Sequence, residues 1–107
     1  DKTKRPLMGR ALEQGSDLPI LTSDNPRSED PAANVADMLA GLARPERAVV
    51  EVDRRAAITK ALQLARPGDV VLILGKGHES GQEFAGHKIP FDDYKVALSI
   101  LRDGGTT

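Results

Sequence analysis

The stretch Asp69–Glu79, DVVLILGKGHE, decides the fold that we expect for this chain. Its five apolar residues, Val70–Leu74, do not alternate with polar residues, a pattern typical of a strand covered on both faces. A glycine-rich polar segment follows directly. Strands of this kind occur in parallel sheets that carry helices on both sides. The stretch therefore predicts an α/β domain with functional groups just beyond the end of a strand.

Apolar and helical segments alternate along the rest of the chain. Leu18–Thr22 and Ala48–Val52 are compact apolar runs that predict two further strands. Capping residues and apolar spacing predict four helices. They are expected from Arg5 to Gln14, from Pro31 after the cap Asp30 until Pro45, from the cap Asp53 until Pro67, and from Asp92 or Asp93 onward, with an irregular hairpin over Gln82–Phe91. This order predicts a three-layer, Rossmann-like α/β domain with a mostly parallel sheet flanked by helices.

Each expected helix has an apolar side that should face the core. The residues expected there are Leu7, Met8, Ala11 and Leu12, then Val35, Met38, Leu39 and Leu42, then Ile58, Leu62 and Ala65, and finally Tyr94, Ala97, Leu98 and Leu101. In the hairpin, Phe91 is interpreted as a core residue and His87 as a surface residue.

Composition limits the classes of function. The chain has 107 residues, enough for one domain over residues 1–107, and its formal net charge of −1 gives no general attraction to nucleic acid or acidic membranes. It contains no cysteine, which excludes a disulfide framework and a thiolate metal site. No apolar run approaches the ~20 residues of a membrane helix. We therefore expect neither nucleic acid nor a membrane as a partner. Because the chain opens at Asp1 without a methionine, we expect a segment of a longer protein.

The first polar cluster is Asp24–Arg27, DNPR, after the first expected strand. Its carboxylate can accept from an ammonium group, its amide can donate and accept, and its proline stiffens the turn. Arg27 offers a planar fork that fits a carboxylate. Together these groups suit a ligand with ammonium and carboxylate groups, such as an amino acid. The alternative is a plain turn in which Arg27 pairs with Glu29 or Asp30 at the surface.

The second polar cluster is Gly75–Glu79, GKGHE, after the third expected strand. Its glycines would let backbone amides approach a ligand, with Lys76 and His78 as anion partners and Glu79 as an ammonium partner. The glycine spacing does not fit a dinucleotide fingerprint or a P-loop. The alternative is a strand-end turn with solvated charges. If the strands are parallel neighbours, both clusters project from the same rim of the sheet.

The three segments KRPLM (4–8), DNPR (24–27) and GKGHE (75–79), in this order, resemble the C-terminal domain of the bacterial Mur ligases, in the branch that adds meso-diaminopimelate. The resemblance implies a cytoplasmic enzyme of peptidoglycan precursor synthesis. In that family ATP phosphorylates the D-glutamate carboxylate of UDP-MurNAc-L-Ala-D-Glu, and the amine of the incoming amino acid attacks the acyl phosphate. It also implies three domains: one for the UDP-sugar, a central one for ATP and Mg²⁺, and a C-terminal one for the amino acid.

The resemblance also implies roles for single residues. Asp24, Asn25, Arg27, Gly75 and Glu79 are expected to bind meso-diaminopimelate, and Lys2, in the basic run at the start of the chain, is expected to reach the phosphates. Arg27 suits the second carboxylate that distinguishes meso-diaminopimelate from lysine, because a site built for it leaves a buried cation unpaired when lysine binds.

Several alternatives remain open at this stage. The chain could come from a lysine-adding member of the family, or it could be a non-catalytic phosphate- or nucleotide-binding module or a regulatory α/β domain. Relative to the family it starts just after a strand, a glycine-rich turn and an arginine, and it contains no ATP P-loop. We therefore expect an N-terminally truncated domain that is inactive alone and that works with the rest of a monomeric ligase.

Overall fold

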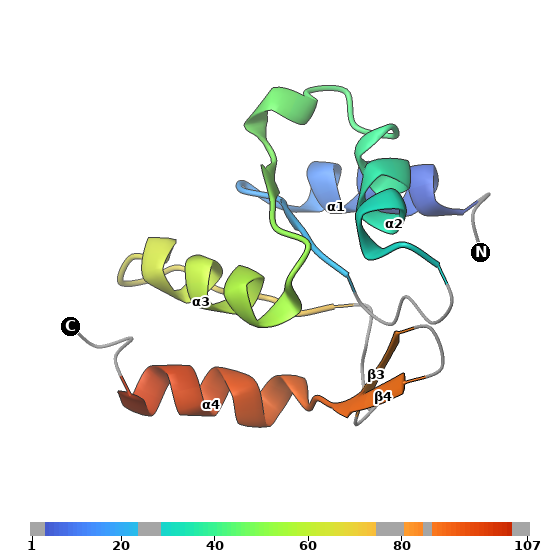
Figure 1. Ribbon diagram of the computed structural model, residues 1–107. Helices are drawn as coiled ribbons and strands as arrows, with labels where there is room; N and C mark the ends of the chain where they lie inside the picture. The colour runs from blue at the N-terminus through green and yellow to red at the C-terminus, as the bar shows by residue number, and fades with distance from the viewer. Residues whose placement is uncertain (1–3, 24–28, 75–80, 85–86, 104–107) are drawn as a thin grey trace.

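Figure 1 shows a computed structural model of the chain, which describes residues 4–23, 29–74, 81–84 and 87–103. The elements in chain order are α1 (Arg5–Gly15), β1 (Ile20–Leu21), α2 (Pro31–Leu39), the 3-10 helix η1 (Pro45–Arg47), β2 (Val49–Val50), α3 (Arg54–Leu64), β3 (Gly81–Phe84), β4 (His87–Pro90) and α4 (Asp93–Asp103). All four predicted helices and the hairpin are confirmed. Among the described residues, no helix is long and apolar enough to cross a membrane.

The two short strands β1 and β2 form a parallel pair, with Ile20 opposite Val49 and Leu21 opposite Val50. Helices α2 and α3 both contact β1, and Figure 1 shows them on opposite sides of the pair. Helix α1 packs on α2, and α4 packs on α3. The predicted α/β architecture, with parallel pairing and helices on both sides, is confirmed.

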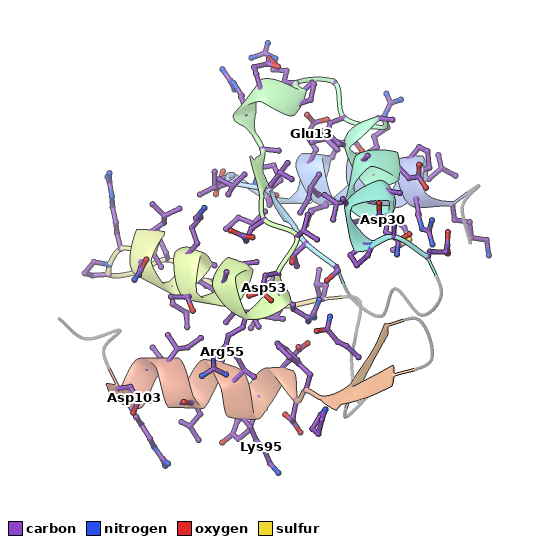
Figure 2. All side chains as sticks on the ribbon, in the orientation of Figure 1. Glu13, Asp30, Asp53, Arg55, Lys95 and Asp103 are labelled. Carbon is purple, nitrogen blue, oxygen red and sulfur yellow. The ribbon has the colours of Figure 1, made fainter. Side chains whose placement is uncertain are left out.

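Aspartates begin the helices that follow the two strands. The Asp30 carboxylate accepts from the Ala32 amide at 3.1 Å, and the Asp53 carboxylate accepts from the Ala56 amide at 2.9 Å. Figure 2 shows both aspartates at the first turns of α2 and α3. Each cap satisfies an amide that has no partner within the helix, worth about 1 kcal/mol. The two caps that the sequence predicted are therefore present.

The core of the first half lies between α1, α2 and the strand pair. Leu21 and Val35 are 1% exposed, and Leu42 is also buried. Partly buried apolar residues surround them: Leu12, Met38, Leu39, Ala48 and Val52. Full burial of a side chain of this size contributes roughly 1.5–3 kcal/mol. This cluster fixes β1, and with it the position at which the chain leaves the strand after Thr22.

The predicted inward face of α1 is wrong. Leu7, Met8 and Ala11 are exposed, and only Leu12 of the expected set is partly buried. The helix instead turns Gly9 toward α2, where an added Cβ would collide with the Met38 carbonyl. Close approach of two helix backbones requires a residue without a side chain, so the glycine sets the rotation of α1 rather than the apolar stripe.

The predicted third strand is also wrong, because Val70–Leu74 is not part of a strand in the structure. Val70, Leu72 and Leu74 are 81%, 71% and 64% exposed, whereas the residues between them are half-buried. A strand requires a neighbour that completes its ladder of hydrogen bonds, and apolar composition does not supply one. The sequence predicted that both faces of this segment would be buried, but only one face is partly covered.

The predicted inward face of α4 is only partly correct, because Ala97 and Leu98 are half-buried as expected but Tyr94 and Leu101 are not. Tyr94 is 75% exposed and Leu101 is exposed, whereas Val96 is buried. The buried line runs through Asp93 and Val96, because the Asp93 carboxylate pairs with Arg54 of α3 and so fixes the rotation of the helix. The interpretation of Tyr94 as a core residue is therefore wrong, and Phe91 is half-buried.

Candidate functional site

None of the predicted site residues lies within the described part of the chain. Lys2, the segment 24–28 (the DNPR segment) and the segment 75–80 (the glycine-rich segment) all fall outside it. These ranges contain Asp24, Asn25, Arg27, Gly75 and Glu79. The structure does describe the residues that flank the two segments, and their contacts show where each segment begins and ends.

A single side chain connects the starts of both segments. The Arg54 guanidinium donates through Nη1 to the carbonyl oxygen of Ser23 at 3.0 Å and through Nη2 to the carbonyl oxygen of Leu74 at 3.2 Å. Ser23 immediately precedes the DNPR segment and Leu74 immediately precedes the glycine-rich segment. The sequence predicted that both segments project from one rim if the strands before them are parallel neighbours, and Val70–Leu74 does not form such a strand. The residues that precede the two segments nevertheless lie around one guanidinium.

Arg54 is 2% exposed and is held by a carboxylate as well as by the carbonyls. Its Nε and Nη2 donate to Asp93 Oδ1 and Oδ2 at 2.8 and 2.6 Å. Arg54 is the first residue of α3 and Asp93 is the first residue of α4. This two-pronged pair satisfies the buried charge and gives the guanidinium one fixed plane.

Ser23 is held by further hydrogen bonds. Its hydroxyl donates to the Val52 carbonyl at 2.9 Å, and the side-chain amide of Gln82 donates to the Ser23 hydroxyl at 3.4 Å. Both Ser23 and Gln82 are buried. Gln82 lies in β3, just after the glycine-rich segment. Residues on both sides of that segment, Leu74 through Arg54 and Gln82 directly, are therefore linked to Ser23, the residue before the DNPR segment.

The other end of the DNPR segment is tied to α1. Arg5 Nη2 and Nη1 donate to the two carboxylate oxygens of Glu29 at 2.7 and 3.1 Å, and Nη1 also donates to Asp37 at 3.0 Å. Hydrogen bonding to Glu29 raises the pKa of Arg5, and Asp37 adds to the effect. This pair joins the first turn of α1 to Glu29, the first described residue after the DNPR segment.

Sequence reasoning missed Arg54, Asp93 and Arg5. One signal was available for Arg54, because a cation in the first turn of a helix opposes the helix dipole and therefore calls for another explanation. Its partner was not predictable from spacing, since Asp93 lies 39 positions further along the chain.

A family comparison bears directly on this arrangement. The family description "Mur ligase, glutamate ligase domain" matches residues 1–77, which include Arg5, Arg54 and the whole DNPR segment. The chain belongs to the Mur ligase family.

Similar proteins agree with this assignment. The Mur ligase chain is 52% identical to "UDP-N-acetylmuramoyl-L-alanyl-D-glutamate--2,6-diaminopimelate ligase" of Aquifex aeolicus, over 98% of this chain and 22% of the relative. A protein of the same name from Chromobacterium violaceum is 54% identical over 98% of this chain and 21% of the relative. A solved structure of a ligase with this name matches with a TM-score of 0.88 and 45% identity, covering 95% of this chain and 21% of that one. The chain thus spans about a fifth of the length of the relatives it matches.

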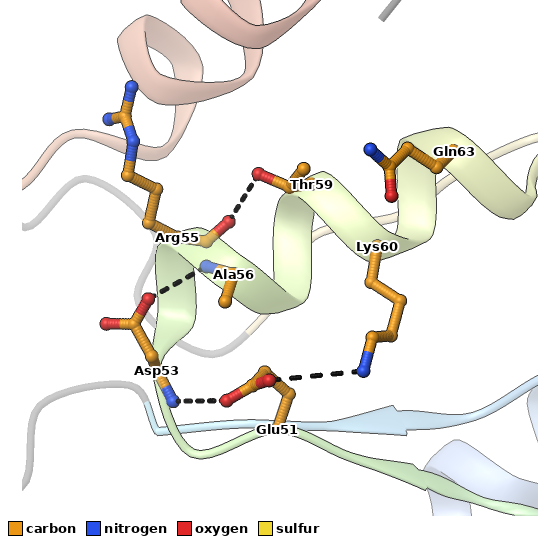
Figure 3. Close-up of a pocket in the computed structure, with 7 residues that line it drawn as sticks. All are labelled: Glu51, Asp53, Arg55, Ala56, Thr59, Lys60 and Gln63. Atoms are coloured by element: carbon orange, nitrogen blue, oxygen red, sulfur yellow. Dashed lines mark hydrogen bonds and ion pairs between the residues drawn. The ribbon is translucent and has the colours of Figure 1, made fainter.

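The Mur ligase chain also has a shallow surface pocket of about 380 Å³ beside the start of α3. Figure 3 shows Glu51 turned toward Lys60 and the Asp53 amide, whereas the Arg55 guanidinium points away from them. Glu51 accepts from the Asp53 amide at 3.3 Å and lies 3.9 Å from Lys60 Nζ, while Asp53 caps the helix. These groups satisfy each other, so we do not assign a ligand to the pocket.

Metal binding was tested against the described residues of the Mur ligase chain. Within 4–23, 29–74, 81–84 and 87–103, no three carboxylate or histidine side chains gather into a group that could hold a metal ion. Mg²⁺ prefers several oxygen ligands around an octahedral site. The described residues therefore do not fit a magnesium site, and none of the roles assigned below to this chain involves one.

Proposed function

We propose that residues 1–107 form the C-terminal, amino-acid-binding domain of a three-domain ligase that adds meso-diaminopimelate to UDP-MurNAc-L-Ala-D-Glu. The observation that carries the proposal is the convergence of Ser23 and Leu74 on Arg54, in a chain about half identical to 2,6-diaminopimelate ligases over nearly its whole length. Because of this convergence, the residues that precede the two predicted binding segments lie close together in the fold. The similarity supplies the chemical class of the ligand.

In this proposal the two segments bind the two ends of the amino acid. Asp24, Asn25, Arg27, Gly75 and Glu79 contact meso-diaminopimelate, and Lys2 contacts the phosphates. Arg27 pairs with the carboxylate that lysine lacks. A bound lysine would remove water from the Arg27 guanidinium and offer no carboxylate in its place. Such a mismatch lowers kcat/KM, relative to the matching substrate, by roughly 10⁴-fold or more.

The reaction itself depends on the rest of the ligase. ATP phosphorylates the D-glutamate carboxylate, the amine of meso-diaminopimelate attacks the acyl carbon, and the C–O bond to phosphate breaks and releases inorganic phosphate. We assign ATP and Mg²⁺ to the central domain and the UDP-sugar to the N-terminal domain. The enzyme is expected in the cytoplasm, as a monomer, where the precursors of peptidoglycan are made.

The test is phosphate release by the full-length enzyme with ATP, Mg²⁺ and UDP-MurNAc-L-Ala-D-Glu. Release is expected with meso-diaminopimelate and not with L-lysine. In the Arg27→Ala variant the KM for meso-diaminopimelate should rise by about 100-fold or more while the KM for ATP stays within twofold, because a charged hydrogen-bonding pair to the substrate is lost.

Each contrary result has a distinct meaning. Release with L-lysine but not meso-diaminopimelate would make the chain part of a lysine-adding ligase and would refute the role of Arg27. An absence of release with either amino acid would refute the ligase proposal. An unchanged KM in the Arg27→Ala variant would leave the ligase intact but remove Arg27 from the substrate site.

A further inference from the structure

We propose that Arg54 is a positioning residue: it holds the backbone of Ser23 and Leu74, the last described residues before the DNPR segment and the glycine-rich segment, in one arrangement on which meso-diaminopimelate binding depends. The inference rests on the proposed function, because it takes these two segments as the substrate site. It assigns Arg54 no contact with the substrate.

The contacts of Arg54 fix backbone rather than side chains. Both carbonyl groups that it binds, those of Ser23 and Leu74, belong to the last described residue before a predicted binding segment. A main-chain hydrogen bond at that place sets the point from which the segment leaves the folded core. Since the two bonds come from one planar group, a shift of one segment start relative to the other breaks at least one bond.

The guanidinium is itself held in place. Asp93 binds Nε and Nη2 from the first turn of α4, so the plane of the fork is set by two helices at once. Gln82 completes the arrangement from the far side of the glycine-rich segment by donating to the Ser23 hydroxyl. The four hydrogen bonds of Arg54 and the bond of Gln82 thus connect the residues on both sides of the glycine-rich segment to Ser23, the residue before the DNPR segment.

Helix stability does not explain an arginine at this position. A cation in the first turn of α3 faces the positive end of the helix dipole, which costs a few tenths of a kcal/mol up to about 1 kcal/mol. Replacing a buried ion pair by apolar residues of similar volume is often neutral or stabilising, so the pair with Asp93 is weak evidence for a role in stability. The neighbouring Arg55 has the same charge in the same first turn but is exposed, so the burial and the contacts of Arg54 distinguish the two residues. Placement of the two segments is the remaining role that the contacts of Arg54 support.

The test uses the full-length ligase with Arg54→Lys and Arg54→Met, and with Arg55→Met as the matched control on the same helix. Lysine keeps the charge but has no planar fork, so it cannot hold two carbonyls and a carboxylate together. The KM for meso-diaminopimelate should rise about tenfold or more in Arg54→Lys, because small misplacements of binding groups are costly. The KM values for ATP and for UDP-MurNAc-L-Ala-D-Glu should stay within twofold, as should all three values in Arg55→Met.

A double variant separates positioning from a merely structural role. If Arg54 acts through the DNPR segment, Arg54→Lys should raise the KM for meso-diaminopimelate far less in the Arg27→Ala background than in the wild type. Full additivity, or a parallel rise of all three KM values, would overturn the proposal. If Arg54→Met does not fold, Arg54→Lys and Asp93→Asn carry the test, with folding checked by thermal melting. Failure of the wild-type enzyme to use meso-diaminopimelate would refute the proposed function instead.

Discussion

At the residue scale, charged side chains that bind backbone groups hold this domain together. Arg54 binds two carbonyls, and Glu13 of α1 accepts from the amides of Ala43 and Arg44, both at 2.8 Å. Figure 2 shows Glu13 between α1 and the chain that follows α2. Such contacts join residues 20 to 31 positions apart, so no local pattern reveals them. The helix caps Asp30 and Asp53, by contrast, act on residues two or three positions away, and the sequence predicted both.

The contacts of Glu13 predict a dependence of stability on pH. Hydrogen bonds from the Ala43 and Arg44 amides lower the pKa of Glu13 below its ordinary value of 4.5. A carboxylate with a depressed pKa in the folded state stabilises the fold above its unfolded-state pKa, and the contribution is lost as the pH falls through the folded-state pKa. The difference in Tm between the wild-type chain and Glu13→Gln should therefore be greatest near neutral pH and should shrink below about pH 4.5.

Thermal melting of both chains from pH 7 to pH 3 measures this difference. Asp103→Asn is the control, since this exposed carboxylate accepts a hydrogen bond from Ser99 of its own helix, α4, and not from backbone amides of another element among the described residues. Its Tm should track that of the wild type at every pH. A Tm difference for Glu13→Gln that is constant across the range would show that the carboxylate charge plays no part.

At the scale of elements, the apolar patterns gave two wrong predictions. In both cases the structure depends on a contact with a partner element, namely close approach of two helix backbones or pairing with a neighbouring strand. The stripe of α1 predicted Leu7 and Met8 inside, but the contact with α2 selects Gly9. The run Val70–Leu74 predicted a covered strand, but a strand depends on a neighbour that its own sequence does not specify. Helix existence was predictable because capping and periodicity are local. Helix rotation was not, because it depends on a partner element.

The α1–α2 contact gives a prediction for Gly9→Ala, in which two opposing effects act on the free energy of unfolding. Alanine in place of glycine within a helix gains about 1 kcal/mol of helix propensity. At Gly9, however, the new Cβ would collide with the Met38 carbonyl, and such overpacking costs about 1–3 kcal/mol or more when backbone must move. We expect the collision to dominate, so that Gly9→Ala lowers the free energy of unfolding by about 1–2 kcal/mol.

Gly15, at the end of the same helix, provides the control. A Cβ added there meets nothing within 4 Å, so Gly15→Ala should be neutral or slightly stabilising. Urea unfolding of the two variants and the wild type gives the comparison. Equal stabilities for Gly9→Ala and Gly15→Ala would mean that α1 and α2 are not in close backbone contact.

At the scale of the whole molecule, the α/β architecture was predictable from the alternation of helical and apolar segments, whereas the site was predictable only as segments. Residues 24–27 and 75–79 were recognisable because polar groups follow apolar runs, and their substrate roles remain predictions. The structure adds the connection between them, through Arg54, Asp93 and Gln82. That connection arises where two helices, α3 and α4, meet the hairpin and the chain after β1, which no single stretch of sequence contains.

The proposed assignment of ATP and Mg²⁺ to the central domain gives the last prediction. The sequence has no P-loop, and the described residues offer no group of side chains suited to a metal ion. An amine attacks a free carboxylate too slowly to observe, so ligation requires the acyl phosphate made with ATP. The 107-residue chain alone, with ATP, Mg²⁺, UDP-MurNAc-L-Ala-D-Glu and meso-diaminopimelate, should therefore release no phosphate above the protein-free blank, while the full-length enzyme does. Circular dichroism of the chain under the same conditions must show its helices, so that inactivity is not loss of fold. Phosphate release that depends on the folded chain alone would mean that this domain carries a nucleotide site of its own, and the proposed assignment of ATP to the central domain would be wrong.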